Sequence, residues 1–567
     1  MYSDVKSVQI LVSLLKQHSI KYLVLSPGNR DVPIVHSVEN DDFFECYSIT
    51  DERSAGFFAI GLIHKYSCPV AICCTSGTAV CNYASAVNEA YYQKLPLLVI
   101  TADRNPFYLD QLEDQMVSQM TIFERACKMS IQLPIVKDEL DYWYCGNRVN
   151  AAILELEHHG KGPVHINVPI EQGLNAFNTR ALPVVNKIVR IDELSDERVA
   201  DLRNRLCNKK IMVLYGQNEL ISEEQIGRIE NFVENNNCVV AVDLLSNLHC
   251  KGTVNIYSAS RMLTQEELLS LLPDIVISVN GNYVSYIRAL FKENHSKMEH
   301  WLVSETGEVQ DPFHCLTTII ESTTDEFFLA FEENKLGNNE SKSSDYYFQW
   351  YNVTKELQIG ELPYSDMMVV QKFMCKLRKG DYLHLANSNS VRIAQSFPLD
   401  KDVVVTCNRG TNGIDGSMSS FIGEAVGDSD NHYLLIGDLS FFYDMNALWN
   451  RYVGNNVRIL LNNNAGAGIF HFIVGTQNVP SLNKHVAAEH FYNAQGWAES
   501  VGMIYISVRN ESEVEPALSI FTARNSDKPI LLEVFTKKED DAAIMQQVYS
   551  LNKPKGLKET IKNLFKR

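Results

Sequence analysis

The 567-residue chain lacks the features of a membrane or secreted protein. It contains no run of about 18 consecutive apolar residues, which a membrane-spanning helix requires. The first segment, MYSDVKSVQILVSLLKQH, has Asp4, Lys6 and Gln9 among its apolar residues and no small-residue cleavage site. A signal peptide needs an uninterrupted apolar stretch. We therefore expect a cytoplasmic protein without membrane association.

Basic residues are also few, and paired cysteine motifs are missing. The chain has 51 Lys and Arg against 69 Asp and Glu, a formal net charge of −18. This balance argues against binding to nucleic acid, so anionic ligands would need local arginines. The 13 cysteines are an odd number and form no C-x-x-C pair. That usage favours free thiols in a reducing cytoplasm over disulfides or a zinc site.

The sequence does have a regular alternation of strand-like and helix-like segments. Its 45% hydrophobic and 21% charged residues are typical of a soluble globular protein. Apolar segments such as YLVLSPG, PVAICCTSG and PLLVITADR alternate with amphipathic segments such as SAGFFAIGLIHKY and NYASAVNEAYYQK. This pattern predicts an α/β fold with mainly parallel sheets, doubly wound by helices on both faces. Ligands of such sheets bind at the carboxyl ends of the strands.

Two breaks divide the chain into three blocks, in line with about 100–200 residues per domain. Residues 178–197 join the first block to the second, and the polar segment ENKLGNNESKSSD (333–345) is typical of a linker. The second block has its own strands, among them KIMVLYGQN and DIVISVNGN, and the third contains YLLIGDLS and VRILLNNN. We predict three doubly wound domains, at 1–182, 190–335 and 346–567.

Asp438 follows the apolar strand YLLIG at the point where a helix could begin. One interpretation is a helix cap, because Asp is preferred there. However, the next strand ends in NNNAGAGIF, which places Asn464 26 residues after Asp438. A carboxylate and a carboxamide at neighbouring strand ends, with the backbone carbonyl of Gly466 and phosphate oxygens, would complete an octahedral Mg²⁺ site, with Mn²⁺ as an alternative. Such a cation usually anchors a diphosphate, which Gly466 and Gly468 would let the backbone approach.

Other interpretations of this segment stay open. AGAGIF is similar to part of a dinucleotide-binding fingerprint, but the third glycine is missing. The three consecutive asparagines, Asn462 to Asn464, are also typical turn residues. The pairing of Gly-Asp with Asn-Asn at this spacing favours the metal site.

The same pairing resembles the thiamine diphosphate-binding motif. Among thiamine enzymes, the chain resembles, over its whole length, the 2-succinyl-5-enolpyruvyl-6-hydroxy-3-cyclohexene-1-carboxylate (SEPHCHC) synthase family of menaquinone biosynthesis. The motifs that carry the resemblance are SPGNR, DERSAGFFAIGL, CTSGTAVCNY, PLLVITADR, GPVHINVPI, NSNSVR, CNRGTNGIDG, IGDLSFFYDMNAL and LLNNNAGAGIF. The resemblance implies a pyrimidine-binding domain first, a central α/β domain, and a diphosphate- and Mg²⁺-binding domain last.

The resemblance also implies a catalytic role for Glu52. Its carboxyl would hydrogen bond the pyrimidine of thiamine diphosphate and favour the tautomer that removes the proton from the thiazolium carbon. The alternative is an acidic residue that favours a helix N-terminus. Ile414 would lie under the cofactor and enforce its bent shape. The other cofactor contacts implied by motif match are Ser388, Leu439, Ser440 and Ile469, beside the metal ligands Asp438, Asn464 and Gly466.

The family decarboxylates 2-oxoglutarate and adds the four-carbon unit to isochorismate, and both substrates are dicarboxylates. Arginine suits them because it is always charged and grips a carboxylate with two hydrogen bonds. By motif match, Ser388, Arg392 and Arg409 would hold the donor, and Arg30 and Arg104 the acceptor. The remaining substrate contacts implied are Asn29, Gln115, Gln119 and Phe470. The resemblance further implies a homo-oligomer, dimer or tetramer, in which Glu52 of one subunit serves the cofactor at Asp438 of another.

Three departures from the family pattern lie on the acceptor side. Asn29 replaces the serine of SPGSR, Asp114 places a negative charge beside Gln115, and the Lys-Arg pair of the middle domain has no counterpart other than Arg288. The acceptor is therefore open. A related 2-oxoacid decarboxylase or carboligase with another anionic acceptor is the alternative. A non-catalytic paralogue is a third interpretation, against which the intact cofactor residues count.

Overall fold

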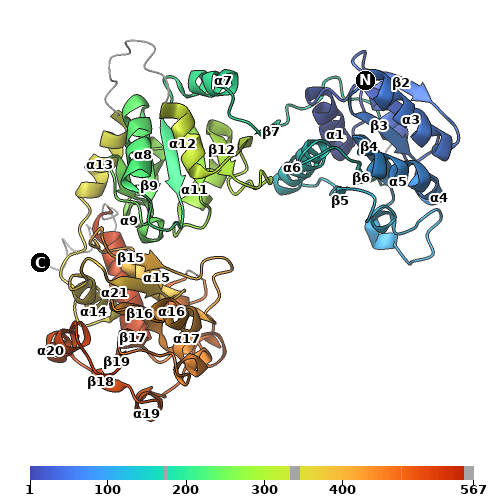
Figure 1. Ribbon diagram of the computed structural model, residues 1–567. Coiled ribbons are helices and arrows are strands. Elements are labelled where there is room, and N and C mark those ends of the chain that lie inside the picture. Colours follow the sequence, from blue (N-terminus) through green and yellow to red (C-terminus); the bar gives the residue numbers. More distant parts are fainter. Residues whose placement is uncertain (172–175, 333–344, 474, 554–567) are drawn as a thin grey trace, which may run out of the picture. The chain divides into compact units, whose positions relative to one another are not determined.

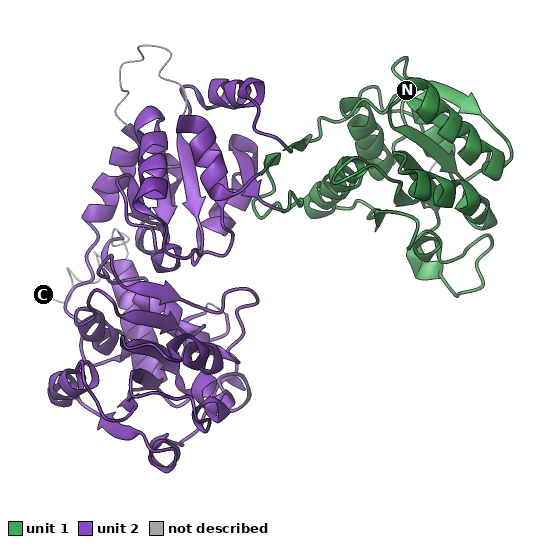
Figure 2. Cartoon of the chain, in the orientation of Figure 1, with its two compact units in different colours: residues 1–192, 306–321 green, residues 193–305, 322–567 purple. Residues whose placement is uncertain are grey.

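The computed structural model describes residues 1–171, 176–332, 345–473 and 475–553. Helices and strands alternate along them and form three mainly parallel sheets (Figure 1), which confirms the predicted α/β fold. The chain separates into two compact units, residues 1–192 with 306–321 and residues 193–305 with 322–567 (Figure 2). The predicted linker lies outside the described residues except for Asp345, which begins a helix.

The first unit contains a six-stranded sheet in the order β2-β1-β3-β4-β6-β5. Its strands are β1 (Tyr22–Leu25), β2 (Glu45–Ser48), β3 (Val70–Cys74), β4 (Leu97–Asp103), β5 (Met129–Gln132) and β6 (Val164–Pro169). Its helices are α1 (Lys6–Gln17), α2 (Val32–Glu39), α3 (Glu52–Tyr66), α4 (Thr78–Asn82), α5 (Ala84–Gln93) and α6 (Glu139–Glu155). Successive strand residues point to opposite faces. Leu23 and Leu25 pack with α1, α2 and α6, while Val24 packs with α3 and α5, so helices cover both faces.

Two short strands complete the first unit. They are β7 (Val189–Ile191) and β13 (Leu316–Glu321), which pair in parallel with Arg190 opposite Ile319. Residues 306–321 thus belong to the first unit although the chain before and after them belongs to the second.

The second unit contains two groups of parallel strands. In the first group, β8 (Ile211–Tyr215), β9 (Cys238–Val242), β10 (Thr253–Asn255), β11 (Ile275–Val279) and β12 (Glu299–Ser304) lie in the order β10-β9-β8-β11-β12. The accompanying helices are α7 (Asp196–Leu206), α8 (Glu223–Asn235), α9 (Ile256–Met262), α10 (Gln265–Ser270), α11 (Ile287–Glu293), α12 (Thr324–Glu332) and α13 (Asp345–Lys355). The strand order reverses between β8 and β11, which makes their carboxyl ends a topological switch point.

The last sheet has the order β15-β14-β16-β17-β19-β18. Its strands are β14 (Tyr382–Leu385), β15 (Val404–Thr406), β16 (His432–Gly437), β17 (Val457–Asn463), β18 (Ile504–Val508) and β19 (Ile530–Phe535). Its helices are α14 (Asp366–Met374), α15 (Asn389–Ala394), α16 (Ser417–Ala425), α17 (Asp438–Tyr443), α18 (Ile469–Phe472), α19 (Gln495–Ser500), α20 (Glu511–Phe521) and α21 (Lys538–Leu551). Tyr433 packs on the α14, α20 and α21 side and Leu434 on the α16 side. Gly437 lies opposite Asn462, so the segments after β16 and β17 leave the same edge of the sheet. None of the described helices is long and apolar enough to cross a membrane.

Candidate active site

A pocket lies at the edge of the last sheet where β16 and β17 end. It brings together seven of the residues predicted from the sequence: Ser388, Ile414, Asp438, Leu439, Ser440, Asn464 and Gly466. Ile469 and Phe470 begin α18, directly after the lining residue Gly468. The elements that supply these side chains are adjacent in the sheet although they are far apart in the sequence, because β14, β16 and β17 are neighbours.

The carboxylate of Asp438 is buried and held by backbone groups. Its Oδ1 accepts a hydrogen bond from the Leu439 N–H (2.6 Å) and its Oδ2 accepts one from the Gly466 N–H (2.9 Å). Helix α17 begins at Asp438 itself and its capping position is Gly437. The interpretation of Asp438 as the helix cap is therefore wrong, because its side chain reaches across to the loop after β17 instead.

Asn464 is oriented by a residue that the sequence did not point to. Its Nδ2 donates to Asp541 Oδ2 (3.3 Å), and Asp541 also accepts from the Thr536 hydroxyl (2.6 Å) and the Asp366 N–H (3.1 Å). With the amide nitrogen engaged, the side-chain oxygen of Asn464 is the atom left for a cation. Outer partners of this kind orient metal ligands and fix their affinity.

The glycines of NNNAGAG are needed for two reasons. Gly466 has φ +139°, and a Cβ there would lie 2.6 Å from the Ala487 carbonyl oxygen. At Gly468 a Cβ would lie 2.8 Å from Asn464 Nδ2. Larger residues would therefore displace the loop or the Asn464 amide from the pocket.

The residues present fit Mg²⁺ and a diphosphate. Asp366 Oδ1, Asn389 Oδ1 and Asn462 Oδ1 are buried at pocket-lining residues and have no hydrogen-bond partner among the described residues. Buried polar atoms are normally paired, so these oxygens indicate a missing partner. Carboxylate, carboxamide and backbone carbonyl oxygens are hard donors that suit Mg²⁺. His490 also belongs here, since its Nε2 lies 3.2 Å from Asp438 Oδ2, and no sequence motif pointed to it.

Glu52 lies in the first unit, at the start of α3. The capping role falls to Asp51, whose Oδ1 accepts from the Ser54 N–H (2.8 Å). Glu52 Oε2 instead accepts a hydrogen bond from Asn82 Nδ2 (3.1 Å). The alternative interpretation, an acid that serves the helix N-terminus, thus describes Asp51 and leaves the Glu52 carboxyl available for another role.

The predicted arginines form two groups, one in each unit. In the first unit, Arg30 is buried and donates to the Ile170 carbonyl (3.1 Å), while Arg104 is paired with Glu113 (2.8 Å). Burial lowers the pKa of Arg30, and the neighbouring charge of Arg104 acts in the same direction. The charges of Glu113 and Asp103 act in the opposite direction, so this positive field is partly offset by carboxylates.

In the second unit, Arg392 donates to the Ser388 carbonyl (2.6 Å) and Arg409 to Asn387 Oδ1 (2.9 Å). Burial lowers the pKa of Arg409, and the like charges of Arg392 and Arg288 also lower it. Arg288 therefore adds to the positive field at Arg409, and its Nε donates to the Tyr283 hydroxyl (3.1 Å).

The polar residues predicted on the acceptor side differ in their surroundings. Asn29, Asp114 and Gln115 are exposed. Gln119 is buried, and its amide binds the Gly77 N–H (2.9 Å) and Asn167 Oδ1 (2.7 Å). Gln119 thus fastens its loop to the sheet.

Asp31 is a further residue that the sequence did not single out, although it directly follows SPGNR. It is fully buried, and neither carboxylate oxygen has a hydrogen-bond partner among the described residues. Burial, together with the smaller effect of the Glu52 charge, raises its pKa from 3.8 to about 6. The carboxylate form is therefore costly in the folded protein.

We expect Asp31→Asn to stabilise the protein near neutral pH. An acid whose pKa is raised on folding stabilises the folded state below pH 4, and this contribution is lost as the pH rises through about 6. The isosteric amide carries no charge, so its advantage should grow across this window to about 1–3 kcal/mol at pH 8. Thermal unfolding of the wild type and of Asp31→Asn at pH 4.5 and pH 8 measures this difference in stability. An equal difference in Tm at the two pH values would contradict the assignment.

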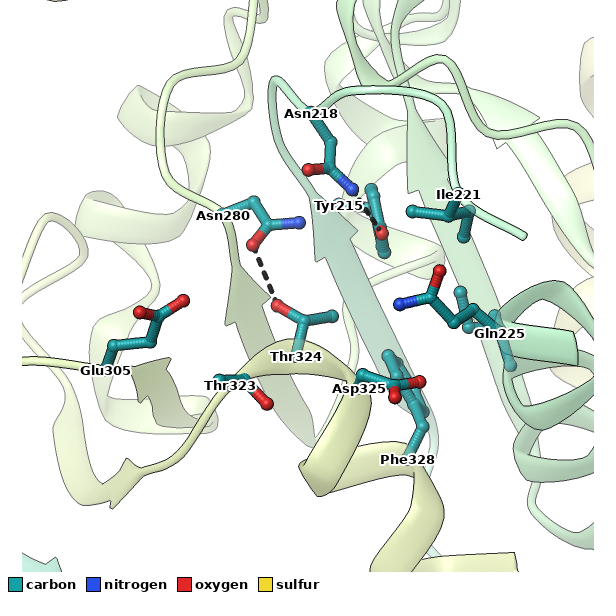
Figure 3. Close-up of a pocket in the computed structure, with 11 residues that line it drawn as sticks. Tyr215, Asn218, Ile221, Gln225, Asn280, Glu305, Thr323, Thr324, Asp325 and Phe328 are labelled. Atoms are coloured by element: carbon teal, nitrogen blue, oxygen red, sulfur yellow. Dashed lines mark hydrogen bonds between the residues drawn. The ribbon is translucent and has the colours of Figure 1, made fainter.

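A second pocket lies at the switch point between β8 and β11. Figure 3 shows Tyr215, Asn218, Asn280 and Thr324 around it, with Asn218 Nδ2 donating to the Tyr215 hydroxyl (2.9 Å) and Thr324 Oγ1 to Asn280 Oδ1 (2.8 Å). Among its described lining residues are none of those predicted from the motifs. Of these two pockets, the one at Asp438 contains the residues predicted from the motifs.

Three mainly parallel sheets and an oxygen-donor pocket after β16 and β17 fit the class of thiamine diphosphate-dependent enzymes. The sequence profile described as "Thiamine pyrophosphate enzyme, N-terminal TPP binding domain" matches residues 5–122. The chain is 43% identical to the SEPHCHC synthase of Phocaeicola vulgatus, over 94% of this chain and 96% of the relative. It is 42% identical to that of Bacteroides fragilis, over 92% and 94%, and 31% identical to that of Flavobacterium johnsoniae, over 94% and 96%. The chain belongs to the SEPHCHC synthase family, which confirms the resemblance identified from its motifs.

Proposed function

We propose that this protein decarboxylates 2-oxoglutarate and adds the four-carbon unit to isochorismate, with thiamine diphosphate and Mg²⁺. The observation that carries the proposal is the pocket in which Asp438, Asn464 and Gly466 meet beside Ser388 and Ile414. Bound thiamine diphosphate supplies the electron sink that allows CO₂ to leave a 2-oxoacid. The same proposal divides the chain into pyrimidine-binding, central and diphosphate-binding domains at 1–182, 190–335 and 346–567.

In this proposal the pocket residues have separate tasks. Asp438, Asn464 and the Gly466 carbonyl would hold Mg²⁺, while Leu439, Ser440 and Ile469 would contact thiamine diphosphate. Ile414 supports the cofactor, and its own carbonyl is fixed by the Ser440 hydroxyl. The Glu52 carboxyl would hydrogen bond the pyrimidine nitrogen of thiamine diphosphate, where it can donate and accept a proton.

The arginines bind the substrate carboxylates. Arg392 and Arg409, in the field of Arg288, suit 2-oxoglutarate because a dicarboxylate relieves their mutual repulsion. Arg30 and Arg104, with Asn29, Gln115 and Phe470, bind the acceptor. Arg104 pairs with the Glu113 carboxylate (2.8 Å), and a substrate carboxylate would replace Glu113 as its partner.

We also propose that the active site lies between two copies of the chain. Glu52 and Asp438 belong to different compact units. Exposed aromatic side chains occur in both units: Phe57 and Phe58 on α3 of the first, and Tyr443, Trp449, Phe491 and Tyr492 in the second. Large exposed apolar side chains are typical of surfaces that a partner covers. Light scattering of the purified protein would give a monomer mass if this proposal is wrong.

Product analysis tests the proposed reaction. The protein is incubated with Mg²⁺, thiamine diphosphate and 2-oxoglutarate, with and without isochorismate, and the products are identified by mass spectrometry. We expect an adduct that carries the four-carbon unit and forms only with isochorismate. CO₂ release without that adduct would overturn the acceptor, and the residues to examine would then be Asn29, Asp114 and Arg288.

A further inference from the structure

Two histidines in the first unit face one carboxylate. His158 and His159 follow α6, and their rings are stacked with centroids 3.8 Å apart. His158 Nε2 lies 3.0 Å from Oε2 of Glu321, the last residue of β13, and His159 Nε2 contacts Glu321 Oε1. Nothing in the proposed reaction uses these residues, which lie in a different unit from Asp438.

We propose that His158, His159 and Glu321 form a second divalent-metal site, suited to a borderline transition metal such as Zn²⁺. The three ligand atoms lie within 4.8 Å of one another. Tetrahedral Zn²⁺ with bonds of about 2.0–2.1 Å separates its ligand atoms by roughly 3.3 Å. Small adjustments of the three side chains would therefore admit the ion.

The surroundings of His158 are those of a metal ligand. Its Nδ1 lies 3.1 Å from Glu155 Oε2, so that carboxylate can accept the Nδ1–H when Nε2, which faces Glu321, binds a metal. A carboxylate behind a histidine is the usual outer partner of a bound metal, because it fixes the tautomer and makes the imidazole a stronger donor. Lys128 lies 3.5 Å from Glu155 Oε1 and donates to the Glu155 carbonyl (2.8 Å), which holds the turn in place.

The backbone of this turn contains an unfavourable conformation. His159 has φ +49°, a left-handed conformation that is uncommon for residues other than glycine. On the other side, a Cβ at Gly307 would lie 2.5 Å from Glu321 Oε2 and 3.2 Å from His158 Nε2. The left-handed histidine brings the second imidazole to Glu321, and the glycine keeps the space beside it open.

The ligand atoms determine which metal ion the site prefers. Two imidazoles and one carboxylate prefer Zn²⁺ or Co²⁺, whereas the oxygen donors at Asp438 prefer Mg²⁺. Lys128 and Arg190 offset the charges of Glu155 and Glu321, so the bound ion is held by its ligands rather than by an excess of negative charge. The His159 side chain is 64% exposed, which leaves a further coordination position open to water.

The metal would cross-link two segments of the first unit that are far apart in the sequence. His158 and Glu321 are 163 residues apart in the sequence. Residues 306–321 return to this unit from the chain of the second, so an ion at β13 would fasten them to the turn after α6. A ligand that binds only the folded state stabilises it, and closing a long loop adds to the effect.

Co²⁺ is the probe, because its visible absorption distinguishes four- or five-coordinate from hydrated ions. The protein is saturated with thiamine diphosphate and millimolar Mg²⁺ to occupy the first site, and Co²⁺ is added under equilibrium dialysis. We expect one Co²⁺ per chain, with d–d bands of low-coordinate cobalt and a rise of several degrees in Tm. His158→Gln, His159→Gln and Glu321→Gln should each abolish the bands.

Two further variants distinguish loss of the proposed metal site from general effects of substitution. Glu155→Gln should keep the bands and weaken Co²⁺ binding by about 10–100-fold, because only the outer partner changes. His64→Gln alters an exposed histidine bound to Gln93 and should bind Co²⁺ like the wild type. Absence of bound Co²⁺, or bands that persist in His158→Gln, would overturn the proposal and leave these residues as an ion-pair cluster.

Discussion

Asp438→Ala should lose Mg²⁺-dependent binding of thiamine diphosphate, and catalysis with it. Changes to outer partners of metals weaken binding by about 10–100-fold, so loss of a direct ligand should cost at least about 100-fold. The substitution also removes the acceptor of the Leu439 and Gly466 N–H groups. Each buried donor left unpaired costs about 1–3 kcal/mol, so some loss of stability will accompany the loss of binding.

Asp438→Asn separates these two effects. The carboxamide keeps the shape of the side chain and one of the two acceptor oxygens but has no charge for the cation, so stability should fall less than in Asp438→Ala while cofactor affinity still falls. Asp527→Ala, at an exposed position of the same unit, is the matched control and should bind normally. Calorimetric titration of thiamine diphosphate with and without Mg²⁺ measures the affinities. Undiminished Mg²⁺-dependent binding by Asp438→Asn would refute the metal assignment.

Glu52→Gln should retain the cofactor and lose turnover. The amide can still accept the hydrogen bond from Asn82 Nδ2, so the local structure is kept. It cannot exchange a proton, and loss of a general acid or base lowers kcat by about 10²–10⁴-fold. CO₂ release from 2-oxoglutarate under saturating cofactor measures this effect without reference to the acceptor.

Asp51→Asn is the control for Glu52→Gln. Asp51 is the adjacent acid and caps α3 through the Ser54 N–H (2.8 Å), a task that asparagine performs equally well. This variant should therefore have near wild-type kcat. A Glu52→Gln enzyme with the kcat of Asp51→Asn would show that Glu52 has no part in proton transfer.

Edge strands account for much of what the sequence did not predict about the fold. The central strands were predicted from the sequence, whereas β2, β5, β10 and β18 were not, and each of these four lies at the end of its sheet. Edge strands are short or half-exposed; the β2 residues, for example, are all at least partly accessible. Without two buried faces they lack the continuous apolar run by which a parallel strand is recognised.

The sequence by itself determined the α/β class, the pairing of Asp438 with Asn464 and the family, because strand periodicity and a motif spanning two neighbouring strands are local patterns. Only the tertiary structure decided that Asp541 orients the Asn464 amide, that Asp31 is buried without a partner, and that Glu321 meets two histidines. Each of these depends on which segments, often many residues apart, pack together and exclude water. Burial and pairing of that kind set the electrostatics of a site, and local sequence patterns do not contain them.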